Sequence, residues 1–296
     1  MTCARPTDRY KAILRIAFLG ILSCLVGTSP VRHATAKKGS VEITYVGNEG
    51  FLIEAGGKKV LVDALYRQGV AGYVFPPKKR QEKMERAKAP FDKIDLVLAT
   101  HHHADHFDPA AVGEHLIHNG RALFVSTPQA AARLRLYLGE NKQALRRMRS
   151  SFPEERQRIR MNHQGIILQL LNVHHGRGQK IENLGFIFEL GGKRFLHLGD
   201  SEGNEKDFRR NDLHTETLDF AFVPYWYLAY DGRAQAISGV IHATHIIVMH
   251  VPPKELEESY ITGLGGWEGM KNKVMSLFPN AVFFETEMEK KTFSTR

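Results

Sequence analysis

The chain has 296 residues, of which 43% are hydrophobic and 25% are charged, and its formal net charge is +9 at pH 7. This is an ordinary globular composition, with enough residues to bury a sizeable core in one large domain or two small ones. The basic excess suggests an anionic partner, but part of it lies in the first 36 residues.

Those first residues resemble a targeting segment. Three basic side chains within the first eleven residues precede an apolar stretch at 12–26, and Ala34-Thr35-Ala36 matches a small-x-small cleavage site. We therefore expect residues 1–36 to be a secretory signal peptide or, if uncleaved, an N-terminal membrane anchor. Residues 37–296 then form the functional domain of an exported protein, periplasmic or secreted.

Removing the leading segment changes the charge and the cysteine content. The remaining chain carries 36 basic and 31 acidic side chains, a net charge of +5. This mild excess argues against nucleic acid as a partner. Both cysteines, Cys3 and Cys24, lie in the leading segment, so the domain itself has no disulfide, thiolate metal ligand or cysteine nucleophile.

The domain opens with an antiparallel meander. Alternating or apolar runs at 41–46, 51–55 and 58–63 predict three strands, with turns at 47–50 and 56–57, and the last strand ends on Asp63. A charged helical run follows at 78–88, where we expect a solvated helix face.

The apolar run at 94–99 leads directly into His101-His102-His103-Ala104-Asp105-His106, the pattern H-x-H-x-D-H. Imidazole nitrogens and carboxylate oxygens are the ligands expected for Zn²⁺ and similar divalent ions. Because these side chains follow a buried strand, they are held on a rigid base. A polar loop is the weaker interpretation.

Further strands and helices alternate along the rest of the chain. A helix is expected at 109–118, with Asp108 as its N-cap, and the basic segment 142–160 predicts either a cap over the site or a solvated basic helix. The other expected strands are 122–126, 165–173, 186–190, 194–198, 218–223, 246–250 and 281–285, and the other expected helices are 128–138, 232–244 and 266–277.

Three more candidate ligands follow strands: His174 or His175, then Asp200, then His250. A site assembled from several strand ends is typical of α/β folds. Strand alternation sends His174 and His175 to opposite faces, so only one of them reaches the site. His250 is favoured over His245 because it ends an apolar run, whereas His245 precedes it.

At these motifs the sequence resembles the metallo-β-lactamase superfamily, from about residue 41 to 285. The matching elements are ITYVGNEGFLIEAGGKKVLVDA, THHHADHF, VHHG, FLHLGDS, DFAFVPY and IIVMH. The pattern is most similar to the branch of L-ascorbate-6-phosphate lactonase-like proteins and N-acyl-phosphatidylethanolamine phospholipase D. The resemblance implies an α/β fold, the four-layer αββα sandwich.

The resemblance also implies a site for two metal ions. The residues that it assigns to the ions are His101, His103 and His175 for the first, Asp105, His106 and His250 for the second, and Asp200 for both. His175 is favoured over His174 because His-Gly is the commoner arrangement in similar proteins. His102 is expected to point elsewhere.

Two departures from the branch pattern stand in the opening meander. The branch often has Gly-His after its first strand, where this chain has Gly47-Asn48, and this puts a substrate contact in doubt. The Asp-Pro common after the third strand is Asp63-Ala64 here, and Asp63 still offers a carboxylate to orient a ligand imidazole.

The implied function is that of a metal-dependent hydrolase of esters, lactones or phosphodiesters, acting through a hydroxide that bridges the two ions. Asp105 and Asp200 are its expected catalytic residues. Zinc is the default metal, with Mn²⁺ or Fe²⁺ as alternatives. A small-molecule or lipid-like anionic substrate is favoured. The other hypotheses are a nuclease of the same superfamily and a non-catalytic metal- or ligand-binding protein on this fold.

Overall fold

Two seven-stranded mixed sheets form the centre of the computed structural model, which describes residues 39–176, 180–203, 205–252, 254 and 259–294. The first sheet has the spatial order β14 (Lys290–Ser294), β1 (Ser40–Gly47), β2 (Gly50–Ala55), β3 (Lys58–Val62), β4 (Leu96–Leu98), β5 (Leu123–Ser126) and β6 (Met148–Ser150). Its pairing is antiparallel from β14 to β3 and parallel from β3 to β6.

The second sheet is built in the same mixed way. Its spatial order is β13 (Ala281–Val282), β12 (Ala243–Met249), β11 (Leu218–Pro224), β10 (Lys193–His197), β9 (Leu184–Leu190), β8 (Ile166–Asn172) and β7 (Arg158–His163). The strands from β10 to β13 are parallel, and β7 to β10 are antiparallel.

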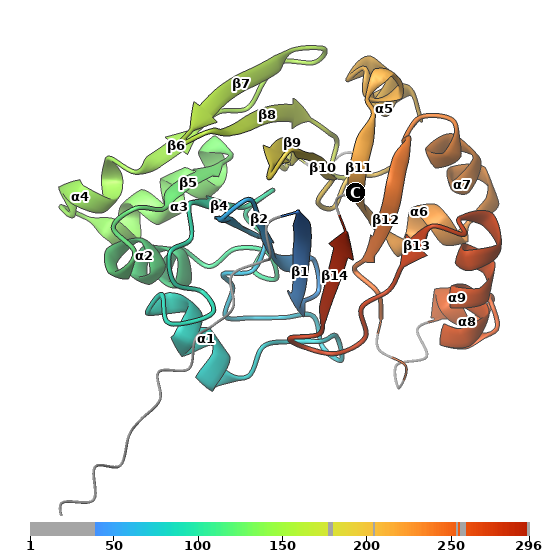
Figure 1. Ribbon diagram of the computed structural model, residues 1–296, viewed down its shortest axis with the longest axis horizontal. Helices are drawn as coiled ribbons and strands as arrows, with labels where there is room; N and C mark the ends of the chain where they lie inside the picture. The colour runs from blue at the N-terminus through green and yellow to red at the C-terminus, as the bar shows by residue number, and fades with distance from the viewer. Residues whose placement is uncertain (1–38, 177–179, 204, 253, 255–258, 295–296) are drawn as a thin grey trace, which may run out of the picture. The chain divides into compact units, whose positions relative to one another are not determined.

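Helices cover the outer face of each sheet (Figure 1). Those beside the first sheet are α1 (Lys78–Glu85), α2 (Pro109–His118), α3 (Pro128–Leu138) and α4 (Lys142–Leu145). Those beside the second are α5 (Glu205–Arg210), α6 (Tyr225–Ala229), α7 (Asp231–Ser238), α8 (Ser259–Thr262) and α9 (Gly266–Leu277). The layers are therefore helix, sheet, sheet, helix, and the predicted αββα sandwich is confirmed.

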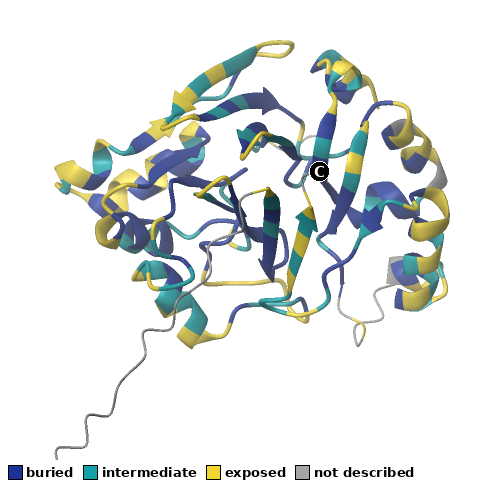
Figure 2. Ribbon diagram, viewed as in Figure 1, coloured by how far each residue is buried: buried dark blue, intermediate teal, exposed yellow. Residues whose placement is uncertain are grey.

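The alternation of side chains along the strands explains this layering. On β3, Val60 and Val62 pack in the core between the sheets, whereas Leu61 packs in the core between the first sheet and its helices. All three are buried, and Figure 2 shows that burial follows the central strands of both sheets, whereas the edge strands β7 and β14 alternate between intermediate and exposed residues. Each such side chain contributes about 1.5–3 kcal/mol when it leaves water.

The start of α2 follows the predicted pattern. Asp108 lies at the N-cap, where its Oδ1 accepts a hydrogen bond from the Ala111 backbone N–H at 2.8 Å, and Pro109 follows in the first turn. Proline suits this position because its missing N–H is not needed there. The cap sets where the chain leaves the H-x-H-x-D-H loop.

The prediction for 142–160 is wrong as a helix. This segment contains α4, β6 and the start of β7, so it supplies an edge strand to each sheet. Arg147 donates hydrogen bonds to the carbonyl oxygens of Leu116, Asn119 and Ala122 at the end of α2. Arg158 pairs with Glu216. These two cations stabilise the fold and are not free to attract a substrate.

Two predictions near the C-terminus also need correction. The helix expected at 232–244 ends at Ser238, because Ala243 begins β12, in parallel register with Leu218 of β11. The strand expected at 281–285 ends at Val282, and the sequence analysis missed β14. That strand carries no apolar run, and its pairing with β1 is a long-range contact.

The expected leading segment and both cysteines lie outside the described residues. Within the described part of the chain, no helix is long and apolar enough to cross a membrane.

A buried histidine joins α1 to α2 and makes the fold sensitive to acid. The His115 Nδ1–H donates to the Met84 carbonyl oxygen at 2.6 Å, and the Nε2 accepts from the Asn119 amide, so the neutral ring is fully satisfied. Burial lowers the pKa of His115 to about 4. The unfolded chain takes up a proton below about pH 6.5, whereas the folded protein takes it up only near pH 4.

We therefore expect His115 to remove about 3 kcal/mol from the free energy of unfolding as the pH falls from about 6.5 to about 4. Urea denaturation of the wild type and the His115→Gln variant across this range measures the effect. The difference between the two proteins isolates His115 from the other histidines. Parallel stability profiles in the two proteins would contradict the assignment.

Candidate metal centre

Loops from four strands meet at one edge of the two sheets. The loop after β4 carries His101, His103, Asp105 and His106, and the loops after β8, β10 and β12 carry His175, Asp200 and His250. Since β4 belongs to the first sheet and the other three strands to the second, the site spans both sheets. Every sequence-predicted ligand is brought here.

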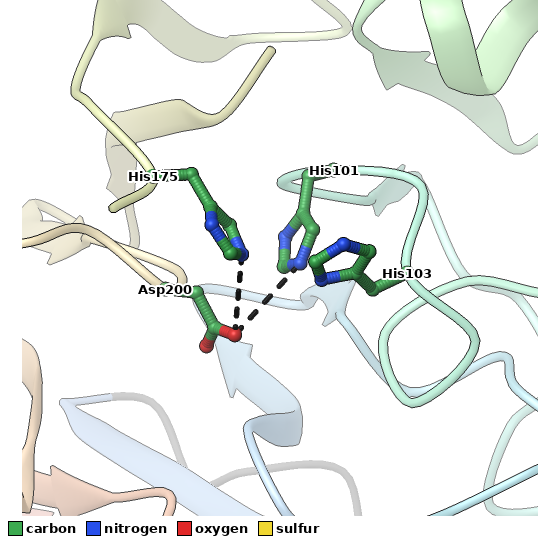
Figure 3. Close-up of side chains that lie close together, drawn as sticks. All are labelled: His101, His103, His175 and Asp200. Atoms are coloured by element: carbon green, nitrogen blue, oxygen red, sulfur yellow. Dashed lines mark ion pairs between the residues drawn. The ribbon is translucent and has the colours of Figure 1, made fainter. Parts of the chain in front are cut away.

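The first group consists of His101, His103, His175 and Asp200, each with one ligand atom within 4.8 Å of the others. The Asp200 Oδ2 lies 3.5 Å from the His175 Nε2 and 3.9 Å from the His101 Nε2 (Figure 3). Bonds from Zn²⁺ to nitrogen and oxygen are about 2.0–2.2 Å, so two ligand atoms of one ion lie no more than about 4 Å apart. Both distances from the Asp200 Oδ2 are therefore short enough for these side chains to share one ion.

The second group consists of Asp105, His106 and His250. The His106 Nε2 lies 3.6 Å from the Asp105 Oδ2, and the His250 Nε2 lies 4.0 Å from the same oxygen. The Asp200 Oδ1 completes the group, at 3.3 Å from the His106 Nε2 and 3.9 Å from the His250 Nε2. Asp200 thus presents one carboxylate oxygen to each group.

The donor atoms suit a divalent ion in both groups. The Nε2 atoms of His101, His106 and His175 and the Oδ1 of Asp200 are buried without a hydrogen-bond partner among the described residues. Buried polar atoms normally have one. Burial lowers the pKa of His101 well below its ordinary value, and it also lowers the pKa of His103 and of His250. These imidazoles are therefore neutral near pH 7, the form that binds metal.

Asp63, at the end of β3, holds the loop that carries the ligands. Its Oδ2 accepts from the His106 Nδ1 at 3.0 Å, which is the contact expected of this carboxylate. The Thr100 backbone N–H and hydroxyl donate to the two carboxylate oxygens of Asp63, each at 2.7 Å. The Thr100 Oγ1 also lies 3.0 Å from the His101 Nδ1. One buried carboxylate therefore fixes an imidazole in each group.

The three neighbouring histidines that are not proposed as ligands, His102, His174 and His245, lie outside both groups. His174 is half-exposed and contacts Asp207, Glu155 and Arg210, whereas its neighbour His175 lies in the first group. His102 lies outside both groups, as expected. His245 stacks on Phe220 with ring centroids 5.1 Å apart.

The segment Gly47-Asn48-Glu49-Gly50, which was predicted only as a turn, borders the site. The Asn48 Nδ2 donates to the Asp105 Oδ2 at 3.1 Å, and the Asn48 carbonyl oxygen accepts from the His250 N–H at 3.2 Å. The residue that departs from the branch pattern therefore holds two residues of the second group. Glu49 is fully buried beside them. Two polar residues between buried strands were the only available signal.

A cavity of about 620 Å³ opens beside the first group. His175, Phe152, Lys180 and Gln129 are among its lining residues. Phe152 comes from the segment 142–160, so that segment borders the cavity with an apolar side chain. On the side of the second group, the rings of Trp226 and His250 lie 4.8 Å apart.

Comparison with solved structures places this geometry in a known fold. Igni18, a metallo hydrolase from Ignicoccus hospitalis, superposes with a TM-score of 0.55 at 19% identity, over 87% of this chain and 100% of that one. YhfI from Bacillus subtilis, a metallo-β-lactamase fold protein, gives 0.54 at 14% identity, over 86% and 100%. CmlA from Streptomyces venezuelae, a diiron β-hydroxylase, gives 0.56 at 14% identity over 86% of this chain, which spans only 54% of CmlA.

The sequence itself matches a family as well. A family model described as the beta-lactamase superfamily domain matches residues 42–225, which is more than half of the chain. The matched region contains the opening meander, the H-x-H-x-D-H loop, His175 and Asp200, and it ends before His250. The chain belongs to the β-lactamase superfamily and has the metallo-β-lactamase fold.

Proposed function

We propose that this protein is a hydrolase that uses two divalent metal ions. His101, His103 and His175 would hold the first ion, Asp105, His106 and His250 would hold the second, and Asp200 would contribute to both positions. The observation that carries this proposal is the position of Asp200, whose Oδ2 faces one group of ligand atoms and whose Oδ1 faces the other. Family membership supports it independently.

The residues of the site have separate roles in this proposal. When bound, two divalent ions polarise a carbonyl or phosphoryl group and lower the pKa of a water molecule toward neutrality. Asp105 and Asp200 would help to hold the ions and would orient the attacking water. Asp63 and Asn48 keep the ligands in place through the hydrogen bonds to His106 and Asp105. No serine or cysteine nucleophile is needed.

The proposed substrate is an ester, a lactone or a phosphodiester of a small or lipid-like anionic molecule. The branch resemblance supports it, as does the mixed lining of the cavity, which includes the apolar Phe152 and polar residues such as Gln129 and Lys180. From the donor types of these seven ligands alone, zinc is the default metal, with Mn²⁺ or Fe²⁺ as alternatives. We also propose that the protein is exported, or anchored through its first 36 residues.

The test is elemental analysis of the purified, reconstituted protein, coupled to a panel of lactones, esters and phosphodiesters. We expect two ions per chain and hydrolysis of at least one class. The His103→Ala variant, which lacks a ligand of the first group, is expected to bind fewer ions and to lose the activity. Fewer than one ion per wild-type chain would overturn the two-ion proposal, and two bound ions without any hydrolysis would count against the enzyme.

A further inference from the structure

A buried carboxylate that the proposed ligand set does not use lies beside the second group. Glu49 sits in the turn between β1 and β2, its exposed fraction is 0%, and neither of its carboxylate oxygens receives a hydrogen bond from a described residue. Its Oε2 lies 3.8 Å from the His106 Nδ1. One of its oxygens lies within 4.8 Å of ligand atoms of both His106 and Asp200.

Hydrogen bonds to the backbone of the turn hold Glu49 in its position. The His197 Nε2–H donates to the Glu49 carbonyl oxygen at 3.2 Å, and the His250 N–H donates to the carbonyl oxygen of the preceding Asn48. On the other side, a Cβ added to Gly50 would lie 2.8 Å from the Asp63 carbonyl oxygen, so the turn packs closely on the end of β3.

The charged groups around Glu49 make its burial unfavourable for the stability of the fold. The charged groups that act on it most strongly are Asp200, His106 and Asp63, and two of these three are also carboxylates. Burying a carboxylate without a counter-charge is costly, and placing it beside two others adds repulsion. Of these three groups only His106 can carry a positive charge, and His106 already contacts the carboxyl groups of Asp63 and Asp200.

We propose that Glu49 is a third carboxylate of the metal centre, which supplies its charge to the second ion and makes that position selective for Mn²⁺ or Fe²⁺ over Zn²⁺. This inference rests on the two-ion site of the proposed function. Together, Glu49, Asp63, Asp105 and Asp200 place four carboxyl groups in and beside the two ligand groups. A site rich in carboxylates favours the harder ions.

The experiment compares metal binding by the whole metal-free protein and its variants, using Mn²⁺ and Zn²⁺ separately in calorimetric titrations. Glu49→Gln keeps the shape of the side chain and removes its charge. We expect about a 10–100-fold loss of Mn²⁺ affinity at the second position, with a smaller loss for Zn²⁺. The ratio of the two affinities therefore shifts toward Zn²⁺. Glu49→Asp keeps the charge and is expected to keep the wild-type ratio more closely.

Glu54→Gln is the matched control. Glu54 is a buried carboxylate on β2, 3.1 Å from the Lys59 ammonium and outside both ligand groups. Its loss is expected to leave both metal affinities unchanged. A purely structural role of Glu49 would change the binding of Mn²⁺ and Zn²⁺ equally in Glu49→Gln and Glu49→Asp.

The outcomes separate this inference from the function on which it rests. If the wild type binds two ions and Glu49→Gln keeps the wild-type ratio of affinities, the role of Glu49 is wrong and the two-ion hydrolase stands. If both variants weaken Mn²⁺ and Zn²⁺ to the same degree, the role is also wrong. If the wild type binds fewer than one ion, the proposed function fails, and the role of Glu49 fails with it.

Discussion

Replacing Asp200 by asparagine is expected to reduce the metal content from two ions to one or fewer and to reduce hydrolysis by about 10³-fold or more. Asp200 is the residue whose two oxygens face both ligand groups, so its loss disturbs both ions at once. Asparagine keeps the shape but lacks the charge and the second oxygen. Elemental analysis measures the first effect, and steady-state kinetics on the substrate found by the panel measures the second.

Two adjacent histidines provide the control for this experiment. His175→Gln removes a ligand of the first group and is expected to lose one ion, whereas His174→Gln changes a half-exposed side chain outside both groups. The His174→Gln protein is therefore expected to retain both ions. An Asp200→Asn protein that keeps two ions and full activity would show that the bridging assignment is wrong.

Phe51→Ala is expected to lower the free energy of unfolding by about 3–5 kcal/mol. The Phe51 ring is fully buried between the sheets, and its centroid lies 4.8 Å from that of Phe222, 5.3 Å from that of Tyr45 and 5.7 Å from that of Phe284. Truncation leaves a cavity that these rings can close only in part. For a protein of this size the loss corresponds to a decrease of about 6–20 °C in Tm.

Differential scanning calorimetry of the metal-free protein measures this decrease without a contribution from bound ions. Leu136→Ala serves as the comparison, because the Leu136 side chain on α3 is 85% exposed. Its effect is expected to stay within about 0.5 kcal/mol. A loss below about 1 kcal/mol for Phe51→Ala would mean that the contact between the sheets is looser than the ring distances indicate.

Most of the local structure could be predicted because the relevant signals are short-range. The short alternating or apolar runs of β1 to β3 predict strands that are covered on one or both faces, and Asp108-Pro109 predicts the start of α2. The predictions failed where a partner distant in sequence decides the structure. The polar β14 is a strand because β1 pairs with it, and the basic 142–160 segment supplies edge strands because both sheets extend to it.

For the site as well, the residues close together in the sequence could be predicted, whereas the residues distant in the sequence could be predicted only in part. His101, His103, Asp105 and His106 lie within six residues after one strand, so their type and spacing alone point to a metal site. For the candidate ligands further along the chain, the sequence left two pairs of alternatives, His174 or His175 and His245 or His250. The three-dimensional structure decided between His174 and His175, because adjacent residues point in opposite directions and the fold determines which direction faces the site.

The sequence by itself thus determined the superfamily, the layered fold and the candidate ligands. Only the tertiary structure decided which side chains share a place, since Asp200 meets His101 and His106 from the opposite sheet. It also placed Asn48 and Glu49, which were predicted only as turn residues, beside the ligands of the second group. Asn48 contacts Asp105 and Glu49 lies near His106, both more than 50 residues further along the chain, and Coulombic interactions follow distance in space and not in sequence.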